Sequence, residues 1–110
     1  MIKKLIVCST ALLIAGAVSL RAADAKETWE KDCAKCHGAD GKGKTKMGEK
    51  MGVKDYTDAK VQDAMTDADM TKAIKEGVKQ DGATKMKAFG DALSDDEIKA
   101  LVKYVRDFKK

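Results

Sequence analysis

The chain has 110 residues, which is enough for one domain and no more, and 36% of them are charged, as expected for a soluble protein with a solvated surface. Lys3, Lys4 and Arg21 account for three of the 22 basic residues, and without them the formal charge falls from +4 to +1. A nearly neutral chain gives no reason to expect nucleic acid as a partner.

The first 22 residues have the parts of a secretory signal peptide: Lys3 and Lys4, an uncharged apolar stretch over residues 5–20, and small residues after it. We expect cleavage after residue 22, or as late as Ala25, so that residues 23–110 form the mature periplasmic domain. The apolar stretch is shorter than the roughly 20 residues of a membrane span. Membrane association is therefore expected only if the signal stays uncleaved.

The first mature helix is predicted over residues 25–36. Ala25, Trp29, Cys33 and Cys36 fall at offsets that place them on one helical stripe. Three glycines then follow at short intervals, namely Gly38, Gly41 and Gly43. We expect them to end the helix and to let the backbone pass close to a bound group.

The end of this helix carries the motif Cys33-Ala34-Lys35-Cys36-His37, which is typical of covalent haem c attachment. Residues three apart on a helix share a face, so both sulfurs can reach one porphyrin edge. His37, the single histidine of the chain, then supplies an imidazole to the iron. A bound haem would also help so short a chain to fold.

Two other uses of the cysteines are weaker alternatives. A thiol–disulfide oxidoreductase needs strands and a cis-proline beside its Cys-x-x-Cys motif, whereas this chain has few strand signals and no proline. A structural zinc site needs four ligands, and only Cys33, Cys36 and His37 are strong candidates.

The middle of the chain predicts a loop to about residue 55 and a short helix over residues 58–65. Thr66 and Asp69 form a weak capping box for a further helix that ends at Gly77. Residues 78–90 are expected to be irregular. Because alternating β-branched or aromatic runs are nearly absent, the fold class is predicted to be all-α.

The last helix has the clearest signals. Ser94 is the expected N-cap and Glu97 completes a capping box. An apolar face follows at helical spacing, with Tyr104 at its border: Ile98, Leu101, Val102, Val105 and Phe108.

The order of these parts resembles a class I cytochrome c, specifically the small monohaem bacterial periplasmic type, over essentially the whole mature chain. The haem motif, Trp29 on the first helix, and Leu101 with Tyr104 on the last match that family. The resemblance implies that the N- and C-terminal helices pack together around one covalently bound haem, which Cys33 and Cys36 attach.

The resemblance also implies the second axial ligand. Met86-Lys87-Ala88-Phe89-Gly90 resembles the segment that carries it, so His37 and Met86 are the expected iron ligands. Met47 and Met51 stay as alternatives, while Met65 and Met70 are expected to pack in the core.

One departure from the family is the absence of proline. Relatives often have a proline after the ligand methionine, and another in the loop after the haem motif, whose carbonyl accepts the histidine N–H. In its place, a backbone carbonyl within residues 45–48 is expected to orient His37.

A closed His/Met iron implies electron transfer rather than enzymatic catalysis, because no coordination position is open to substrate. The expected partners are redox proteins, namely a respiratory reductase or a terminal oxidase or reductase, and the protein is expected to be a monomer. A gas-binding or peroxidase-like haem protein with a labile or absent methionine ligand is the alternative.

Charge is distributed unevenly along the mature chain. Residues 37–54 and residues 72–87 each carry five lysines, whereas residues 55–71 carry five aspartates. Lysines of the first two segments can surround an exposed haem edge and guide an acidic partner. The lysines concerned are Lys42, Lys44, Lys46, Lys50, Lys79, Lys85 and Lys87.

Overall fold

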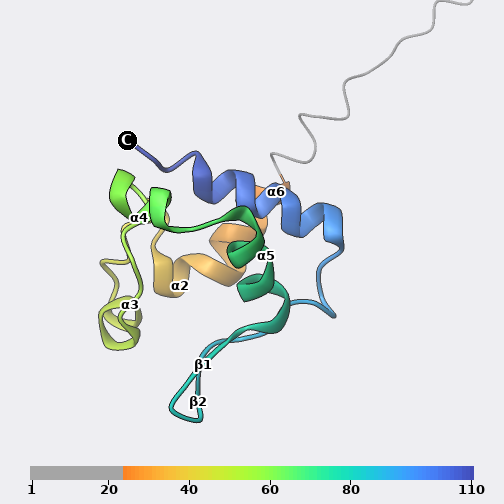
Figure 1. The fold of residues 1–110 in the computed structure, drawn as a ribbon, viewed down its shortest axis with the longest axis horizontal. Helices are drawn as coiled ribbons and strands as arrows, with labels where there is room; N and C mark the ends of the chain where they lie inside the picture. The colour runs from red at the N-terminus through yellow and green to blue at the C-terminus, as the bar shows by residue number, and fades with distance from the viewer. Residues whose placement is uncertain (1–23) are drawn as a thin grey trace, which may run out of the picture.

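Helices account for most of the regular structure in the computed structural model, which describes residues 24–110 (Figure 1). The predicted signal peptide, residues 1–22, lies outside the described residues. In the part that is described, no helix has both the length and the apolar character needed to cross a membrane.

The first helical segment confirms the helix predicted over residues 25–36. Residues 24–28 are α-helical and continue into a π-helical turn, η1 (Trp29–Cys33), and then into α2 (Ala34–His37). The Ala34 N–H donates to the Trp29 carbonyl, which closes the wide turn. The sequence did not predict this π-turn, a rare feature that is often found beside functional sites. Gly38, at φ 82°, ends the segment.

Three later helices begin at side-chain caps, and the sequence predicted two of these caps, Thr66 and Ser94. Asp58 caps α4 (Ala59–Ala64), Thr66 forms a capping box with Asp69 at α5 (Asp67–Glu76), and Ser94 forms one with Glu97 at α6 (Asp95–Arg106). These contacts satisfy backbone N–H groups that have no partner within a first helical turn.

The predicted loop up to residue 55 contains a short helix, α3 (Lys46–Met51), that the sequence analysis missed. Thr45 is its N-cap, because the Thr45 side chain accepts a hydrogen bond from the Gly48 N–H. The cap is formed by a threonine within a glycine- and lysine-rich stretch, where no apolar periodicity indicates a helix.

The expectation of an irregular segment over residues 78–90 was wrong. β1 (Val78–Gln80) pairs antiparallel with β2 (Ala83–Met86), and Asp81 and Gly82 turn the chain with positive φ angles. An Asp-Gly pair is the usual signal of such a hairpin. The all-α prediction is corrected accordingly to a helical fold with one two-stranded hairpin, which projects away from α6 (Figure 1).

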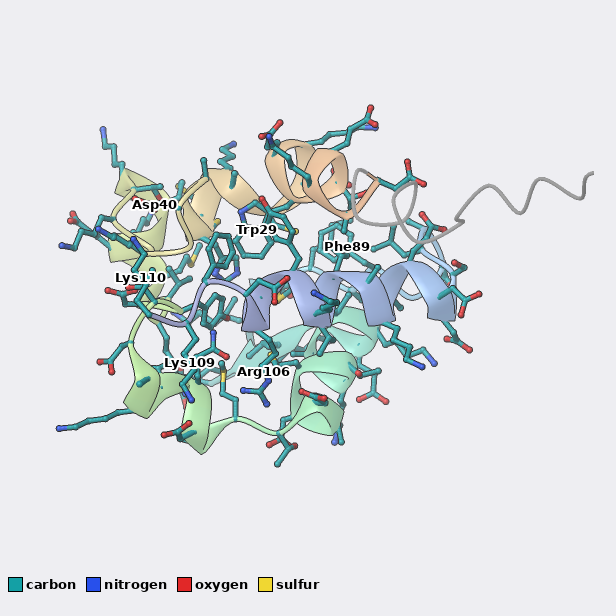
Figure 2. The ribbon with its side chains drawn as sticks, turned by 90° about the horizontal axis from the view of Figure 1, so that it is seen from above. Trp29, Asp40, Phe89, Arg106, Lys109 and Lys110 are labelled. Carbon is teal, nitrogen blue, oxygen red and sulfur yellow. The ribbon has the colours of Figure 1, made fainter. Side chains whose placement is uncertain are left out.

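The core lies between the first and last helices. Ala25 and Trp29 are buried in one cluster with Leu101, Val102 and Val105 of α6, and Met70 of α5 completes it. Trp29 lies between the N-terminal helix and α6 in Figure 2. Its Nε1–H donates to the Gly38 carbonyl over 2.9 Å, which fixes the end of α2 against this core.

The C-terminal end of α6 holds the segment around α4 through polar contacts. Gln62 is 1% exposed, and its Nε2 donates to the carbonyls of Tyr56 and Val105 over 2.7 and 2.8 Å. Arg106 donates to the Gln62 and Met65 carbonyls and pairs with Asp67. Figure 2 shows Arg106 pointing from α6 toward these helices.

Candidate haem-binding site

A cavity of about 280 Å³ lies inside the helical body, and residues from both halves of the chain line it. Cys33 and His37 reach it from η1 and α2, and Met86 reaches it from the end of β2. Apolar and aromatic side chains complete most of the wall, among them Trp29, Tyr56 and Leu101. The structure therefore brings three of the four predicted site residues to one apolar space.

The two cysteines of the motif are free and half-buried, and Cys33 is the one that lines the cavity. Burial, with smaller effects from Asp32 and Cys36, raises the pKa of Cys33 to about 11. Redox-active thiols need the opposite shift, because the thiolate is the nucleophile. The site therefore does not have the electrostatics of a thiol–disulfide oxidoreductase.

A zinc site also finds no support. Within residues 24–110, no group of three or more histidine, cysteine or acidic side chains is placed to hold a metal ion. Cys33, Cys36 and His37 adjoin in sequence, but their side chains do not converge on one point as a closed tetrahedral site requires.

His37 has the properties of a neutral metal ligand. Burial lowers its pKa, so the imidazole is uncharged at neutral pH. Its Nδ1 is buried without a hydrogen-bond partner, the only side-chain nitrogen or oxygen of this kind among the described residues. The ring packs against Trp29 and Tyr56, with centroid separations of 5.5 and 5.2 Å.

The carbonyl expected within residues 45–48 does not accept from His37, so that expectation was wrong. The loop binds the motif backbone instead: Thr45 Oγ1 donates to the Cys36 carbonyl over 2.7 Å, and the Gly43 N–H donates to the His37 carbonyl over 2.7 Å. Gly48 passes so close to the Cys36 carbonyl that a Cβ atom would collide with it. The loop thus follows the backbone of the motif closely without a hydrogen bond to His37 Nδ1.

The base of the hairpin positions Met86. Met86 pairs with Val78 across the ladder, and a Cβ atom on Gly77 would lie 2.5 Å from the Met86 carbonyl. Just beyond, the Phe89 N–H donates to the Ile74 carbonyl over 2.8 Å, which ties the strand end to α5. Hairpin pairing and this return to α5 together aim Met86 at the cavity.

The remaining methionines divide into two groups. Met47 and Met51 are absent from the lining of the cavity, whereas Met65 and Met70 both contribute to it. Met70 is also buried in the core, as the sequence predicted for it. Tyr56 also lines the cavity but was not among the predicted site residues, because a single aromatic side chain in a loop carries no periodic signal.

The residues present fit a covalently attached haem. The cavity wall is mainly apolar, and it offers a thiol, a neutral imidazole and a thioether, which are groups that c-type haem uses for attachment and ligation. The fold and the motif define a small cytochrome c of the class I type.

The family can be stated more narrowly. The chain belongs to the family described as "Cytochrome C oxidase, cbb3-type, subunit III", whose model matches residues 20–105. It is therefore a c-type cytochrome, a haem protein of electron transfer.

Two solved structures are similar to this chain. A protein titled "KustC0563 c-type cytochrome" is 36% identical, with a TM-score of 0.71, over 79% of this chain and 99% of that one. A mutant of the same cytochrome is 35% identical, with a TM-score of 0.68, over 78% of this chain and 99% of that one. Among curated proteins, no match was found.

Proposed function

We propose that this protein is an exported monohaem cytochrome that carries single electrons between periplasmic redox partners. The observation that supports this most directly is the shared cavity, to which Cys33, His37 and Met86 arrive from opposite parts of the chain. When bound there, a haem supplies one-electron chemistry between ferric and ferrous iron. The sequence has one Cys-x-x-Cys-His motif, and we therefore infer one haem.

Each residue of the site has a separate task in this proposal. Cys33 and Cys36 form the thioether bonds that keep the cofactor attached. His37 would hold the iron through its neutral imidazole, and Met86 through its thioether. The apolar wall excludes water, and a thioether ligand with low solvent access favours the ferrous state.

The partners are proposed to be respiratory proteins. The family description names an oxidase subunit, which agrees with a terminal oxidase or a reductase as a partner of this chain. Export through the signal peptide would bring the domain to the periplasm, where such partners expose their electron-transfer sites. Small, transient interfaces are typical of redox encounters.

The ligand assignment can be tested with holoprotein variants of matched chemistry. We expect purified protein to contain one covalent haem and the ferric form to show the weak near-infrared band of methionine–iron bonding. Met86→Ala should abolish that band, because it removes the sulfur ligand. Met65→Ala should retain it, although Met65 also lines the cavity.

Different failures of this experiment would overturn different parts of the proposal. Loss of the band in Met65→Ala, with its retention in Met86→Ala, would reassign the sixth ligand to Met65. Rapid carbon monoxide binding by the reduced wild-type protein at neutral pH would favour an open iron site. A mature protein without the mass of haem would overturn the proposed function itself.

A further inference from the structure

The imidazole of His37 packs against two aromatic rings. The Tyr56 ring is nearly parallel to it, at 5.2 Å between centroids and 24° between planes, and the Trp29 ring lies at 5.5 Å and 35°. The buried Nδ1 has no hydrogen-bond partner. Ring packing, rather than a hydrogen bond, therefore holds this side chain in its orientation.

The carbonyls of the loop that could accept from His37 accept from the loop itself: the Thr45 carbonyl from the Glu49 N–H over 2.9 Å, and the Gly48 carbonyl from the Val53 N–H over 3.0 Å. Thr45 Oγ1 donates to the Cys36 carbonyl and accepts from the Gly48 N–H over 2.8 Å. The Gly43 N–H donates to the His37 backbone carbonyl. These bonds secure the loop and the main chain of the motif, and none of them involves the imidazole ring.

Tyr56 is well suited to set that rotation, because its own backbone is held on both sides. The Tyr56 N–H donates to the Gly41 carbonyl over 2.9 Å, and the Tyr56 carbonyl accepts from Gln62 Nε2 over 2.7 Å. Gln62 in turn is buried against α6. The Tyr56 ring thus presents a fixed, flat surface to His37 inside the cavity.

We propose that Tyr56 is the positioning residue for His37: its ring, together with that of Trp29, sets the plane of the ligand imidazole in place of a backbone carbonyl. This inference rests on the proposed haem function. A hydrogen bond from the second ring nitrogen normally fixes a metal-bound histidine and raises its basicity. Here stacking supplies the orientation, and the imidazole stays a weaker donor to the iron.

Three holoprotein variants test the role of the ring. Tyr56→Leu removes the flat surface, Tyr56→Phe keeps the ring without the hydroxyl, and Tyr104→Leu removes an aromatic ring that contacts Trp29 and Phe108 but not His37. The g-values of the ferric electron paramagnetic resonance spectrum report ligand-plane orientation. We expect them to shift in Tyr56→Leu and to match wild type in Tyr56→Phe and Tyr104→Leu.

Two results from these variants would overturn the inference. Wild-type g-values in Tyr56→Leu would show that the ring does not orient His37. An equal shift in Tyr56→Phe and Tyr56→Leu would assign the effect to the hydroxyl group instead of the ring.

A measurement on the wild-type protein keeps the test independent of variant folding. In the ferrous state, nuclear magnetic resonance of ¹⁵N-histidine-labelled protein should give the Nδ1–H of His37 a shift typical of an N–H without an acceptor. A strongly downfield, hydrogen-bonded proton would overturn the inference and leave the proposed function intact. Wild-type protein that binds no haem would overturn both.

Discussion

The burial of His37 links the protonation of one side chain to the stability of the folded state. The surrounding apolar wall lowers the pKa of the imidazole, because a charged ring would lose its hydration there. In the unfolded chain without haem, the same ring regains its ordinary pKa, about 6.5. Below that pH the unfolded state binds a proton that the folded state excludes.

The free energy of unfolding of the haem-free chain, in which no iron holds the imidazole, is therefore expected to fall as the pH drops below about 6.5, by up to about 1.4 kcal/mol per pH unit from this one group. Between pH 7 and pH 9 His37 should contribute no pH dependence. Guanidinium unfolding at half-unit steps from pH 8 to pH 4.5 measures this. The lower pH limit avoids the range of Asp55, whose pKa lies below its usual value because of hydrogen bonds from Thr57. A free energy that stays level or rises on acidification would contradict the prediction.

At the scale of elements, α6 organises the molecule through two different contacts. Its apolar face packs against Ala25 and Trp29 of the first helix and lines the cavity. Its C-terminal end binds α4 and α5 through the polar contacts of Gln62 and Arg106. The second contact also secures Tyr56, whose carbonyl accepts from Gln62. Damage to this polar contact should therefore affect both the fold and the site.

Gln62→Leu tests this element contact. The change leaves the Tyr56 carbonyl without its donor, whereas the Val105 carbonyl keeps the bond from the Phe108 N–H. An unsatisfied buried group costs about 1–3 kcal/mol. We expect a loss of that size in the free energy of unfolding of the holoprotein. Gln80, an exposed residue of β1, is the only other glutamine of the chain, and Gln80→Leu is the matched control with an expected change within about 0.5 kcal/mol. Equal losses in the two variants would show that the buried contact has no special role.

At the scale of the whole molecule, charge is separated over the surface. Exposed lysines lie on α3 (Lys46 and Lys50) and on or beside the hairpin (Lys79 and Lys87), and none of these four forms an ion pair with another described residue. By contrast, Asp63 and Asp67 of the acidic segment pair with Lys109 and Arg106. In Figure 1, α3 and the hairpin lie on the side of the molecule away from α6. This arrangement leaves a positive excess on one side, where it can attract an anionic reactant.

Oxidation of the reduced protein by ferricyanide, an anionic probe, is therefore expected to slow as ionic strength rises, because salt screens the attraction. At low salt, the double variant Lys79→Gln, Lys87→Gln should react several-fold more slowly than wild type. The control variant Lys99→Gln, Lys103→Gln removes the same charge from α6 and should change the rate less. Stopped-flow absorbance of the haem measures the oxidation rate of the wild type and both double variants. A rate that does not depend on ionic strength would exclude steering by these lysines.

Local interactions explain why much of this molecule can be predicted from its sequence. Each capping box joins two residues that are three positions apart in the sequence, namely Thr66 with Asp69 and Ser94 with Glu97. The starts of α5 and α6 can therefore be predicted from a few neighbouring residues. The haem motif is equally local. The hairpin was missed because its strands are mostly exposed and lack alternation, although Asp81 and Gly82 carried the turn signal.

The sequence by itself thus determined the attachment motif and the capped helices, and it identified Cys33 and His37 as residues of the site. Only the tertiary structure decided that Met86 and Met65 reach the cavity while Met47 and Met51 do not. It also decided that aromatic rings, not a loop carbonyl, surround the His37 imidazole. The physical reason is separation along the chain: these contacts join segments up to dozens of residues apart, and their geometry depends on how the helices and the hairpin pack together.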